Sequence, residues 1–325
     1  MIVSSLATNL HQHYKRLWMC VLLLGALDLP CLGLAAPKQV LVLLSEDAVL
    51  YKEAANALRE GLESEVSSGK LLIRTLVIGE GGLSAVSAPP DTLLVPLGAK
   101  ATQATEHLDQ AILAGLLSRQ TYEKFFISSG HNPRRPVSTV YLDQPLVRHM
   151  QLVHALQPRA QSVGVLLGSA QTAVQPALLN AARASGLSLT STTVNSGAEV
   201  FPALQNLLPN VDVLLLLPDP SVINRHTVQN LMLSAYRQHV PAVAYSQDLV
   251  QVGALAAVFS TPQQIGRQLA EIIQNILPGK NWDLPPPVYP KYFTINTNAS
   301  VARALEINVP GEASLRQRMD AGSGL

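Results

Sequence analysis

The reactive side chains of this sequence form two patterns that resemble catalytic motifs, and neither has the arrangement its chemistry needs. Ser67 and Lys70 have the S-x-x-K spacing of a serine nucleophile with a lysine base, but they straddle a predicted helix end and the Gly69 turn. A nucleophile must be held rigidly beside its base. The stretch Gly79-Glu80-Gly81-Gly82 lacks the Lys-Ser/Thr pair of a phosphate-binding loop. An exported α/β hydrolase is therefore disfavoured.

The sequence also offers few residues for metal binding or thiol chemistry. His149 and His154 lie five residues apart on a predicted helix, without the i, i+4 spacing of a zinc pair, and we expect both at the surface. The only cysteines are Cys20 and Cys31, both within the first 35 residues. We therefore expect no metal site, no cofactor and no enzymatic activity.

The composition indicates a folded protein without a nucleic-acid groove. Of the 325 residues, 48% are hydrophobic and only 14% are charged, which excludes extensive disorder and suffices for two domains. The formal net charge is +1 and there is no long run of Lys and Arg, so no nucleic-acid partner is expected.

The first 35 residues have the three-part pattern of a secretory signal. Lys15-Arg16 stand directly before the apolar run Leu17–Leu27, and the small residues Gly33-Leu34-Ala35-Ala36 follow. We expect cleavage after Ala35 and a periplasmic location. An uncleaved N-terminal anchor and lipid attachment at Cys31 are the alternatives, although the residues before Cys31 are not small.

The remaining chain alternates apolar strand-sized runs with amphipathic helices. Strands are predicted at 39–44, 71–78, 92–97, 112–117, 124–127, 162–167, 187–194, 211–217 and 242–245, and helices at 51–66, 100–108, 176–184, 199–208, 224–239 and 262–277. Strand–helix units in series imply parallel sheets with right-handed crossovers. Two such series predict two doubly wound lobes whose strand-end loops form a ligand crevice. Residues after Gly311 are expected to be loosely held.

Three stretches carry a resemblance to a known family. They are Tyr141-Leu142-Asp143-Gln144-Pro145 with residues 152–160, Gly253-Ala254-Leu255-Ala256 with residues 265–270 and 277–280, and residues 295–310. Here the chain resembles the ABC-transporter substrate-binding family that includes tryptophan- and tyrosine-type periplasmic receptors. The resemblance spans nearly all of the chain after the predicted signal.

The resemblance implies the type I periplasmic-binding-protein fold: an α/β protein of two doubly wound parallel-sheet lobes joined by a three-crossing hinge. Lobe 1 would comprise residues 36–140 plus 253–282, and lobe 2 residues 141–252 plus 283–325. The crossings would lie near Tyr141, Gly253 and Asn281. Closure about such a hinge sequesters the ligand.

In this family the ligand lies against loops that follow strands. For the first lobe this implies that Ser45 donates to a carboxylate and Tyr51 stacks on the ligand, although a helix cap and a packing role are the alternatives. Gly98 and Ala99 open a helix whose N–H groups favour an anionic group. Ala99 and Lys100 stand where the family carries hydroxyl residues, which weakens a tryptophan-type assignment.

Further candidates follow the later strands. Ser129 is expected to end the last strand of the first lobe, and Arg134 and Arg135 beyond it are expected to be solvated. In the second lobe Asp219 suits a ligand ammonium, or else caps a helix. The other candidates of this lobe are Ser169, Gln171, Ser246 and Asp248.

The resemblance implies a periplasmic solute-binding protein of an ABC-type importer, a monomer that closes around a small, amino-acid-like or aromatic ligand. Its partner would be an ABC permease or another membrane receptor. A protein that kept the fold but senses ligand or acts as a scaffold for a signalling partner is the alternative.

Overall fold

The structure is a computed structural model, and it describes residues 36–78, 87–127 and 135–321. The predicted signal, both cysteines, Ser129 and Arg134 lie outside the described residues.

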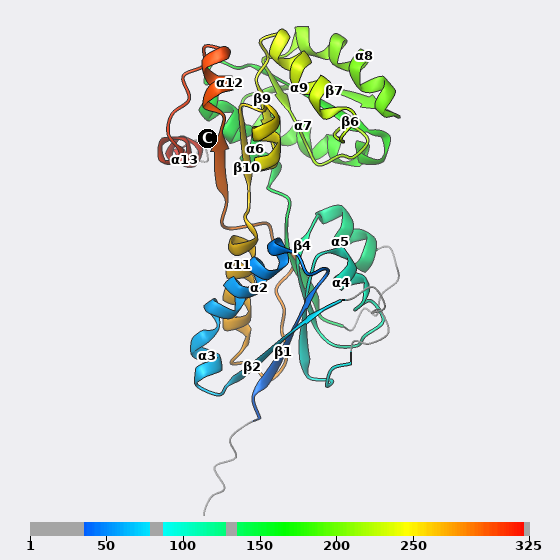
Figure 1. The fold of residues 1–325 in the computed structure, drawn as a ribbon, viewed down its shortest axis with the longest axis vertical. Helices are drawn as coiled ribbons and strands as arrows, with labels where there is room; N and C mark the ends of the chain where they lie inside the picture. The colour runs from blue at the N-terminus through cyan, green and yellow to red at the C-terminus, as the bar shows by residue number, and fades with distance from the viewer. Residues whose placement is uncertain (1–35, 79–86, 128–134, 322–325) are drawn as a thin grey trace, which may run out of the picture. The chain divides into compact units, whose positions relative to one another are not determined.

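The first sheet is wholly parallel and has the strand order β2-β1-β3-β4-β5 (Figure 1). Its three central strands are mostly apolar and buried because helices cover a parallel sheet, whereas one edge strand is largely exposed and the other includes Ser138 and Thr139. They are β1 (Lys38–Leu44), β2 (Leu71–Val77), β3 (Thr92–Leu97), β4 (Ile112–Leu117) and β5 (Val137–Tyr141). The helices along this part of the chain are α2 (Val49–Gly61), α3 (Glu63–Ser67), α4 (Ala99–Gln103) and α5 (Arg119–Phe126).

The second sheet has the order β11-β10-β9-β8-β6-β7, and only β11 runs antiparallel to its neighbour. Its strands are β6 (Ser162–Gly168), β7 (Ser188–Val194), β8 (Val213–Leu215), β9 (Ala242–Ala244), β10 (Ala256–Phe259) and β11 (Thr294–Thr297). The helices along this part of the chain are α6 (Leu146–Leu156), η1 (Ser169–Val174), α7 (Gln175–Ala184), α8 (Gly197–Leu207), η2 (Leu208–Asn210), α9 (Val228–Arg237), α10 (Gln247–Val252), α12 (Ala299–Ala304) and α13 (Glu312–Ala321). Helix α11 (Pro262–Ile276) lies among them in the sequence but packs on the first sheet. The predicted α/β fold of two sheets is confirmed.

The strand predicted at 124–127 is wrong, because α5 occupies this segment. Ser118 accepts a hydrogen bond from the Thr121 N–H at 3.1 Å and caps the helix. Tyr122 and Phe126 are both buried at the i, i+4 spacing of a helix face. The last strand of the first sheet is instead β5, so Ser129 does not follow that strand.

The passage back from the second sheet to the first lies beyond the expected point near Gly253. Ala256 and Ala257 pair with Val243 and Ala244 of β9, so β10 belongs to the second sheet. The chain leaves that sheet after Phe259 and enters α11, which packs along α2 beside the first sheet (Figure 1).

The C-terminal residues are ordered against the second sheet, contrary to the expectation of a loose tail. Helix α13 packs on α6. Its Leu315 and Met319 are 0% and 2% exposed and belong to the hydrophobic core between α6 and the second sheet. Arg318 donates to the Ala155 carbonyl at 3.1 Å. The tail is therefore part of the packed fold.

Two residues expected at the surface are buried. Arg135 is 6% exposed, and its Nη1 donates to the carbonyls of Thr105 and Glu106 at 3.0 and 3.1 Å and also to that of Leu108. Its guanidinium thus binds backbone carbonyls of the segment that follows α4, and it is not solvated. His149 is 2% exposed on α6, and neither ring nitrogen has a hydrogen-bond partner among the described residues.

The contact between α2 and α11 depends on small residues. A Cβ atom on Gly266 would lie 2.1 Å from the Ala54 carbonyl oxygen, and one on Gly61 would lie 2.6 Å from the Ala270 Cβ. The two helix backbones therefore approach more closely than larger side chains allow.

Replacing Gly266 with alanine is expected to destabilise the protein by about 1–3 kcal/mol, because the added methyl meets backbone that side-chain rotation cannot move. Urea unfolding measures the change. Gly311→Ala is the matched control, since nothing lies within 4 Å of the place its methyl group would occupy, and we expect a change within about 0.5 kcal/mol. Equal stabilities of the two variants would contradict the close approach.

Candidate ligand-binding site

Three residues predicted for the first lobe lie together where β1 and β3 end. Gly98 has a φ of +89°, and a Cβ there would lie 2.7 Å from both the Ser45 Oγ and the Tyr51 ring. Only glycine fits this backbone conformation and this space. The Ser45 Oγ donates to the Leu97 carbonyl at 2.8 Å and accepts from the Ala101 N–H at 3.0 Å. Ser45 is thus buried and caps α4, and its single proton is already donated within the protein.

Charged pairs flank this group. Lys100 forms an ion pair with Glu46 at 2.6 Å, and Lys52 forms one with Asp47. All four side chains are more than half exposed, so each pair contributes little to stability. Ala99 is also exposed, at the first residue of α4. The rim of this lobe therefore carries exposed charged side chains beside Gly98 and Ala99.

The end of β4 supplies residues that the sequence prediction did not include. Leu116 has a φ of +56° beside a register irregularity between Gly115 and Leu117, a strained conformation for a leucine. The chain then turns into α5, where Arg119 donates from Nε to Glu123 at 2.7 Å and from Nη1 to the Tyr289 hydroxyl at 3.2 Å. These two hydrogen bonds raise the pKa of Arg119, so its guanidinium stays charged.

The segment after β5 adds a carboxylate and an aromatic surface. The Arg119 N–H donates to the Asp143 carboxylate at 2.6 Å. Burial raises the pKa of Asp143, and this hydrogen bond acts in the opposite direction. Tyr141 packs against Tyr289 with ring centroids 5.2 Å apart, and Tyr289 is 36% exposed. The stretch Tyr141–Pro145 carries part of the family resemblance, but the hydrogen bond between Asp143 and Arg119 cannot be read from the sequence.

In the second sheet, Asp219 joins the loops that follow β6 and β8. It is 4% exposed, and its Oδ2 accepts from the Gly168 N–H at 2.6 Å while its Oδ1 accepts from the Ser221 N–H at 2.9 Å. Its backbone carbonyl accepts from the N–H groups of Val222 and Ile223. The carboxylate therefore fixes the geometry of both loops.

Two more predicted residues lie near Asp219. Burial raises the pKa of the half-buried Tyr245, and the carboxylates of Asp219 and Asp248 raise it further. Asp219 thus follows β8, and Tyr245 and Asp248 follow β9. Ser246 caps α10 through the Leu249 N–H at 3.4 Å, while Asp248 is exposed on the first turn of that helix.

The last two candidates follow β6. Ser169 is exposed at the start of η1. The Gln171 Nε2 donates to the Gln120 Oε1 on α5 at 3.0 Å. This hydrogen bond connects a loop of the second sheet with a helix of the first, at the carboxyl ends of β6 and β4.

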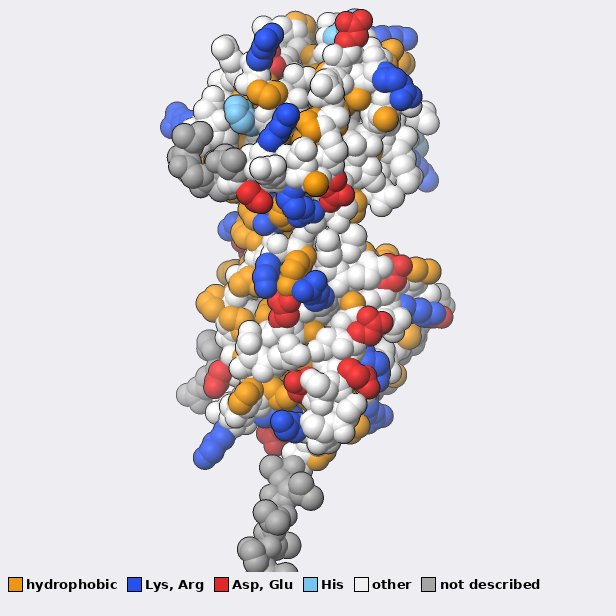
Figure 2. Space-filling view, turned by 90° about the vertical axis from the view of Figure 1, so that its left-hand side faces the viewer, with side chains coloured by type: hydrophobic (Ala, Val, Ile, Leu, Met, Phe, Trp, Pro, Cys, Tyr) orange, Lys and Arg blue, Asp and Glu red, His pale blue; other side chains and the backbone are white. Residues whose placement is uncertain are grey.

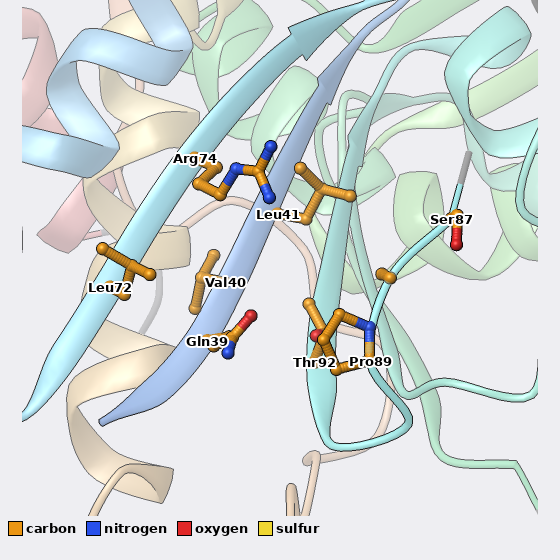
Figure 3. Close-up of a pocket in the computed structure, with 9 residues that line it drawn as sticks. Gln39, Val40, Leu41, Leu72, Arg74, Ser87, Pro89 and Thr92 are labelled. Carbon is orange, nitrogen blue, oxygen red and sulfur yellow. The ribbon is translucent and has the colours of Figure 1, made fainter. Parts of the chain in front are cut away.

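The pocket drawn in Figure 3 lies apart from these loops. It is formed by the early residues of β1, β2 and β3 and the segment before β3, and its volume is about 20 Å³. That is room for about one water molecule. The labelled Arg74 and Thr92 side chains border it from two strands (Figure 3). The strand-end loops therefore remain the better candidate for a ligand site.

Neither a metal cluster nor a membrane-spanning helix occurs in the part of the chain that the structure describes. Among residues 36–78, 87–127 and 135–321, no three His, Cys, Asp or Glu side chains are grouped so that they could hold a metal ion. In the same ranges, no helix combines the length and apolar character that crossing a membrane requires.

Comparison with known families and structures identifies this architecture. The ABC transporter substrate binding protein family matches residues 124–318. That match covers more than half of the sequence, and the chain belongs to this family. No curated protein matches the sequence.

Several solved structures share the fold. A ligand-free, open substrate-binding protein with adhesive properties from Clostridium difficile has 18% identity and a TM-score of 0.65, covering 85% of this chain and 97% of that one. An ABC domain in complex with L-Trp from Streptococcus pneumonia has 19% identity and a TM-score of 0.56, with coverages of 86% and 98%. A conserved domain protein from Vibrio cholerae has 21% identity and a TM-score of 0.56, with coverages of 86% and 97%. The suspected family and fold are thus confirmed.

Proposed function

We propose that this protein is the exported solute-binding component of an ABC-type importer and that it acts in the periplasm as a monomer. Its ligand would bind between the strand-end loops of the two lobes, and an ABC permease would receive it. One observation carries the proposal: in a member of this family, both sheets present polar and aromatic side chains at their carboxyl ends, with Arg119 and Tyr51 on one side and Tyr245 and Asp248 on the other.

The mechanism is ligand-driven closure. Each lobe alone offers part of a binding surface, and a ligand that contacts both lobes stabilises the arrangement in which both contacts are made. The population shifts only by the difference between the ligand's affinities for the two arrangements. The Gln171–Gln120 hydrogen bond supports this mechanism, because it joins the segment after β6 in the second lobe to α5 in the first.

An amino-acid-like or aromatic solute fits these side chains best. Asp248 is an exposed carboxylate that can accept from an ammonium group, and Arg119 can pair with a carboxylate. Tyr51, Tyr245 and Tyr289 offer aromatic faces for stacking. Asp219 would act mainly through the loops it holds, because both of its oxygens already accept backbone N–H groups.

Thermal unfolding of the full-length protein against amino acids and aromatic metabolites tests this proposal. A ligand present at about 100 times its Kd adds about 2.7 kcal/mol to the stability and raises Tm accordingly. We expect Asp248→Ala to keep the unliganded Tm and to lose much of that increase. A screen without any increase in Tm, on protein shown to be folded, would argue against this ligand class.

A sensory or scaffolding role is the second candidate, and the exposed Lys100–Glu46 pair favours it. Here charge stands beside Gly98 at the position of the family's hydroxyl, so a ligand carboxylate would meet Glu46 as well as Lys100. For this role we expect that a membrane receptor other than a permease co-purifies with the protein. We also expect that no compound in the ligand screen raises Tm.

A further inference from the structure

The chain passes between the two sheets three times. The first passage runs from β5 to α6, and the second from β10 to α11. The third runs from Val288, which forms a bridge with Val140 of the first sheet, to Thr294, which begins β11 of the second. Any change in the angle between the lobes must be absorbed in these three segments.

A chain of hydrogen bonds joins the three segments. The Arg148 Nη1 donates to the Gln144 Oε1 at 2.6 Å, the Gln144 Nε2 donates to the Ser260 Oγ at 2.8 Å, and the Ser260 hydroxyl donates to the Tyr292 carbonyl at 2.6 Å. Gln144 and Ser260 are each 6% exposed. Gln144, Ser260 and Tyr292 come from the first, second and third passages respectively, so one buried chain ties all three together.

The two ends of this series of hydrogen bonds decide which group donates to which. A guanidinium can only donate and a backbone carbonyl can only accept, so the Gln144 amide and the Ser260 hydroxyl each have one orientation that satisfies both neighbours. Hydrogen bonds aligned in this way polarise one another. Loss of the Gln144 amide or of the Ser260 hydroxyl therefore interrupts the whole series of hydrogen bonds.

Contacts from α11 hold the third passage at Tyr289, Lys291 and Tyr292, while Arg148 on α6 of the second lobe donates to the Pro290 carbonyl at 2.9 Å. On α11, the Gln268 Nε2 donates to the Tyr289 carbonyl at 3.2 Å, and its Oε1 accepts from the Lys291 N–H at 2.7 Å. The Tyr292 hydroxyl donates to Glu271 of the same helix, and the Arg267 guanidinium lies 4.3 Å from the Tyr292 ring centroid.

At Phe293 the second lobe holds the same segment. The Arg316 Nη2 on α13 donates to the Phe293 carbonyl at 2.8 Å. The guanidinium groups of Arg148 and Arg316 lie 4.4 and 4.3 Å from the Phe293 ring centroid. Basic and acidic side chains gather on the face drawn in Figure 2, on the side where Figure 1 shows α11 and α13. Because the Gln264 Nε2 on α11 still donates to the Thr294 Oγ1 at 3.1 Å, the anchoring changes from one lobe to the other over residues 290–294.

We propose that residues 290–294 are the pivot of the third passage, and that the hydrogen-bonded series Arg148–Gln144–Ser260–Tyr292 positions all three passages so that the lobes reorient about one axis. Gln144 and Ser260 are then positioning residues that contact no ligand. The inference rests on the lobe reorientation of the proposed function, but its test needs no ligand, so a failed ligand screen and a failed hinge test are distinguishable.

The test measures the distance between two spin labels, one on each lobe, without added ligand. Labels at Asn56→Cys on α2 and Gln205→Cys on α8 occupy exposed positions, and Cys20→Ser with Cys31→Ser removes the native thiols. We expect Gln144→Leu and Ser260→Ala each to broaden the distance distribution. The double variant should broaden it no further, because both changes break the same chain.

Thr139→Val is the matched control, since it deletes a buried hydrogen bond of 3.0 Å to the Ala114 carbonyl inside the first sheet. It should leave the distribution unchanged. If Gln144→Leu does not fold, Ser260→Ala alone decides the outcome. The proposal is overturned by a folded Ser260→Ala variant with the parent distribution, by equal broadening in the control, or by broadening that adds in the double variant.

Discussion

Replacing Asp219 with alanine is expected to cost about 3–5 kcal/mol of folding stability, because hydrogen bonds to a charged group contribute about 1.5–3 kcal/mol each. Both carboxylate oxygens accept backbone N–H groups, from Gly168 and Ser221, and the side chain is 4% exposed. The alanine variant leaves the buried Gly168 N–H and the partly buried Ser221 N–H without an acceptor. Urea unfolding measures the loss.

Asp219→Asn sharpens this prediction. An amide has one acceptor oxygen, so it can satisfy only one of the two N–H groups and presents an NH₂ group to the other. We expect a loss of stability close to that of alanine. Asp248→Ala is the control, because Asp248 is exposed, and its stability should stay within about 0.5 kcal/mol of the parent. Equal losses for the Asp219 and Asp248 variants would contradict the structural role of Asp219.

Acid is expected to destabilise the protein through His149. Burial, together with the nearby Arg148 charge, lowers the pKa of this histidine from 6.5 to about 4. Between these values the unfolded chain binds a proton that the folded protein does not. Stability is therefore fully present above pH 6.5, falls as the pH drops towards 4, and changes no further below that. A shift of this size corresponds to about 3 kcal/mol.

The measurement is the free energy of unfolding from pH 7 to pH 4 for the parent and for His149→Leu. The free energy of unfolding of the variant should fall less between pH 7 and pH 4 than that of the parent, since leucine binds no proton. His154→Leu, an exposed change on the same helix, should keep the parent's pH dependence. Parallel curves for the parent and His149→Leu would show that the histidine is not buried in its neutral form.

Local patterns were sufficient to predict most of the architecture. Runs such as residues 39–44 and 92–97 are continuously apolar because both faces of a parallel strand are covered, and the observed strands match them closely. The rule that ligands meet the carboxyl ends of parallel strands selected Ser45 and Gly98, which the structure brings together with Tyr51. It also selected Asp219 and Asp248, which both act on Tyr245.

The prediction failed where a short segment had to be judged alone. Residues 124–127 are apolar enough for a strand, yet the Ser118 cap and the Tyr122–Phe126 spacing make a helix. The tail after Gly311 has little periodic apolar signal, and only contact with α6 gives Leu315 and Met319 a buried environment.

The sequence by itself determined the class of fold and the positions of most of its strands, because these depend on hydrophobic period and on turn residues close in sequence. The tertiary structure alone decided which polar groups are partners. Gln144 and Ser260 are 116 residues apart, Asp219 and Gly168 are 51 apart, and Arg135 reaches carbonyls about 30 residues earlier. Such pairings are set by how the packed helices and sheets bring distant segments together, and no local pattern records them.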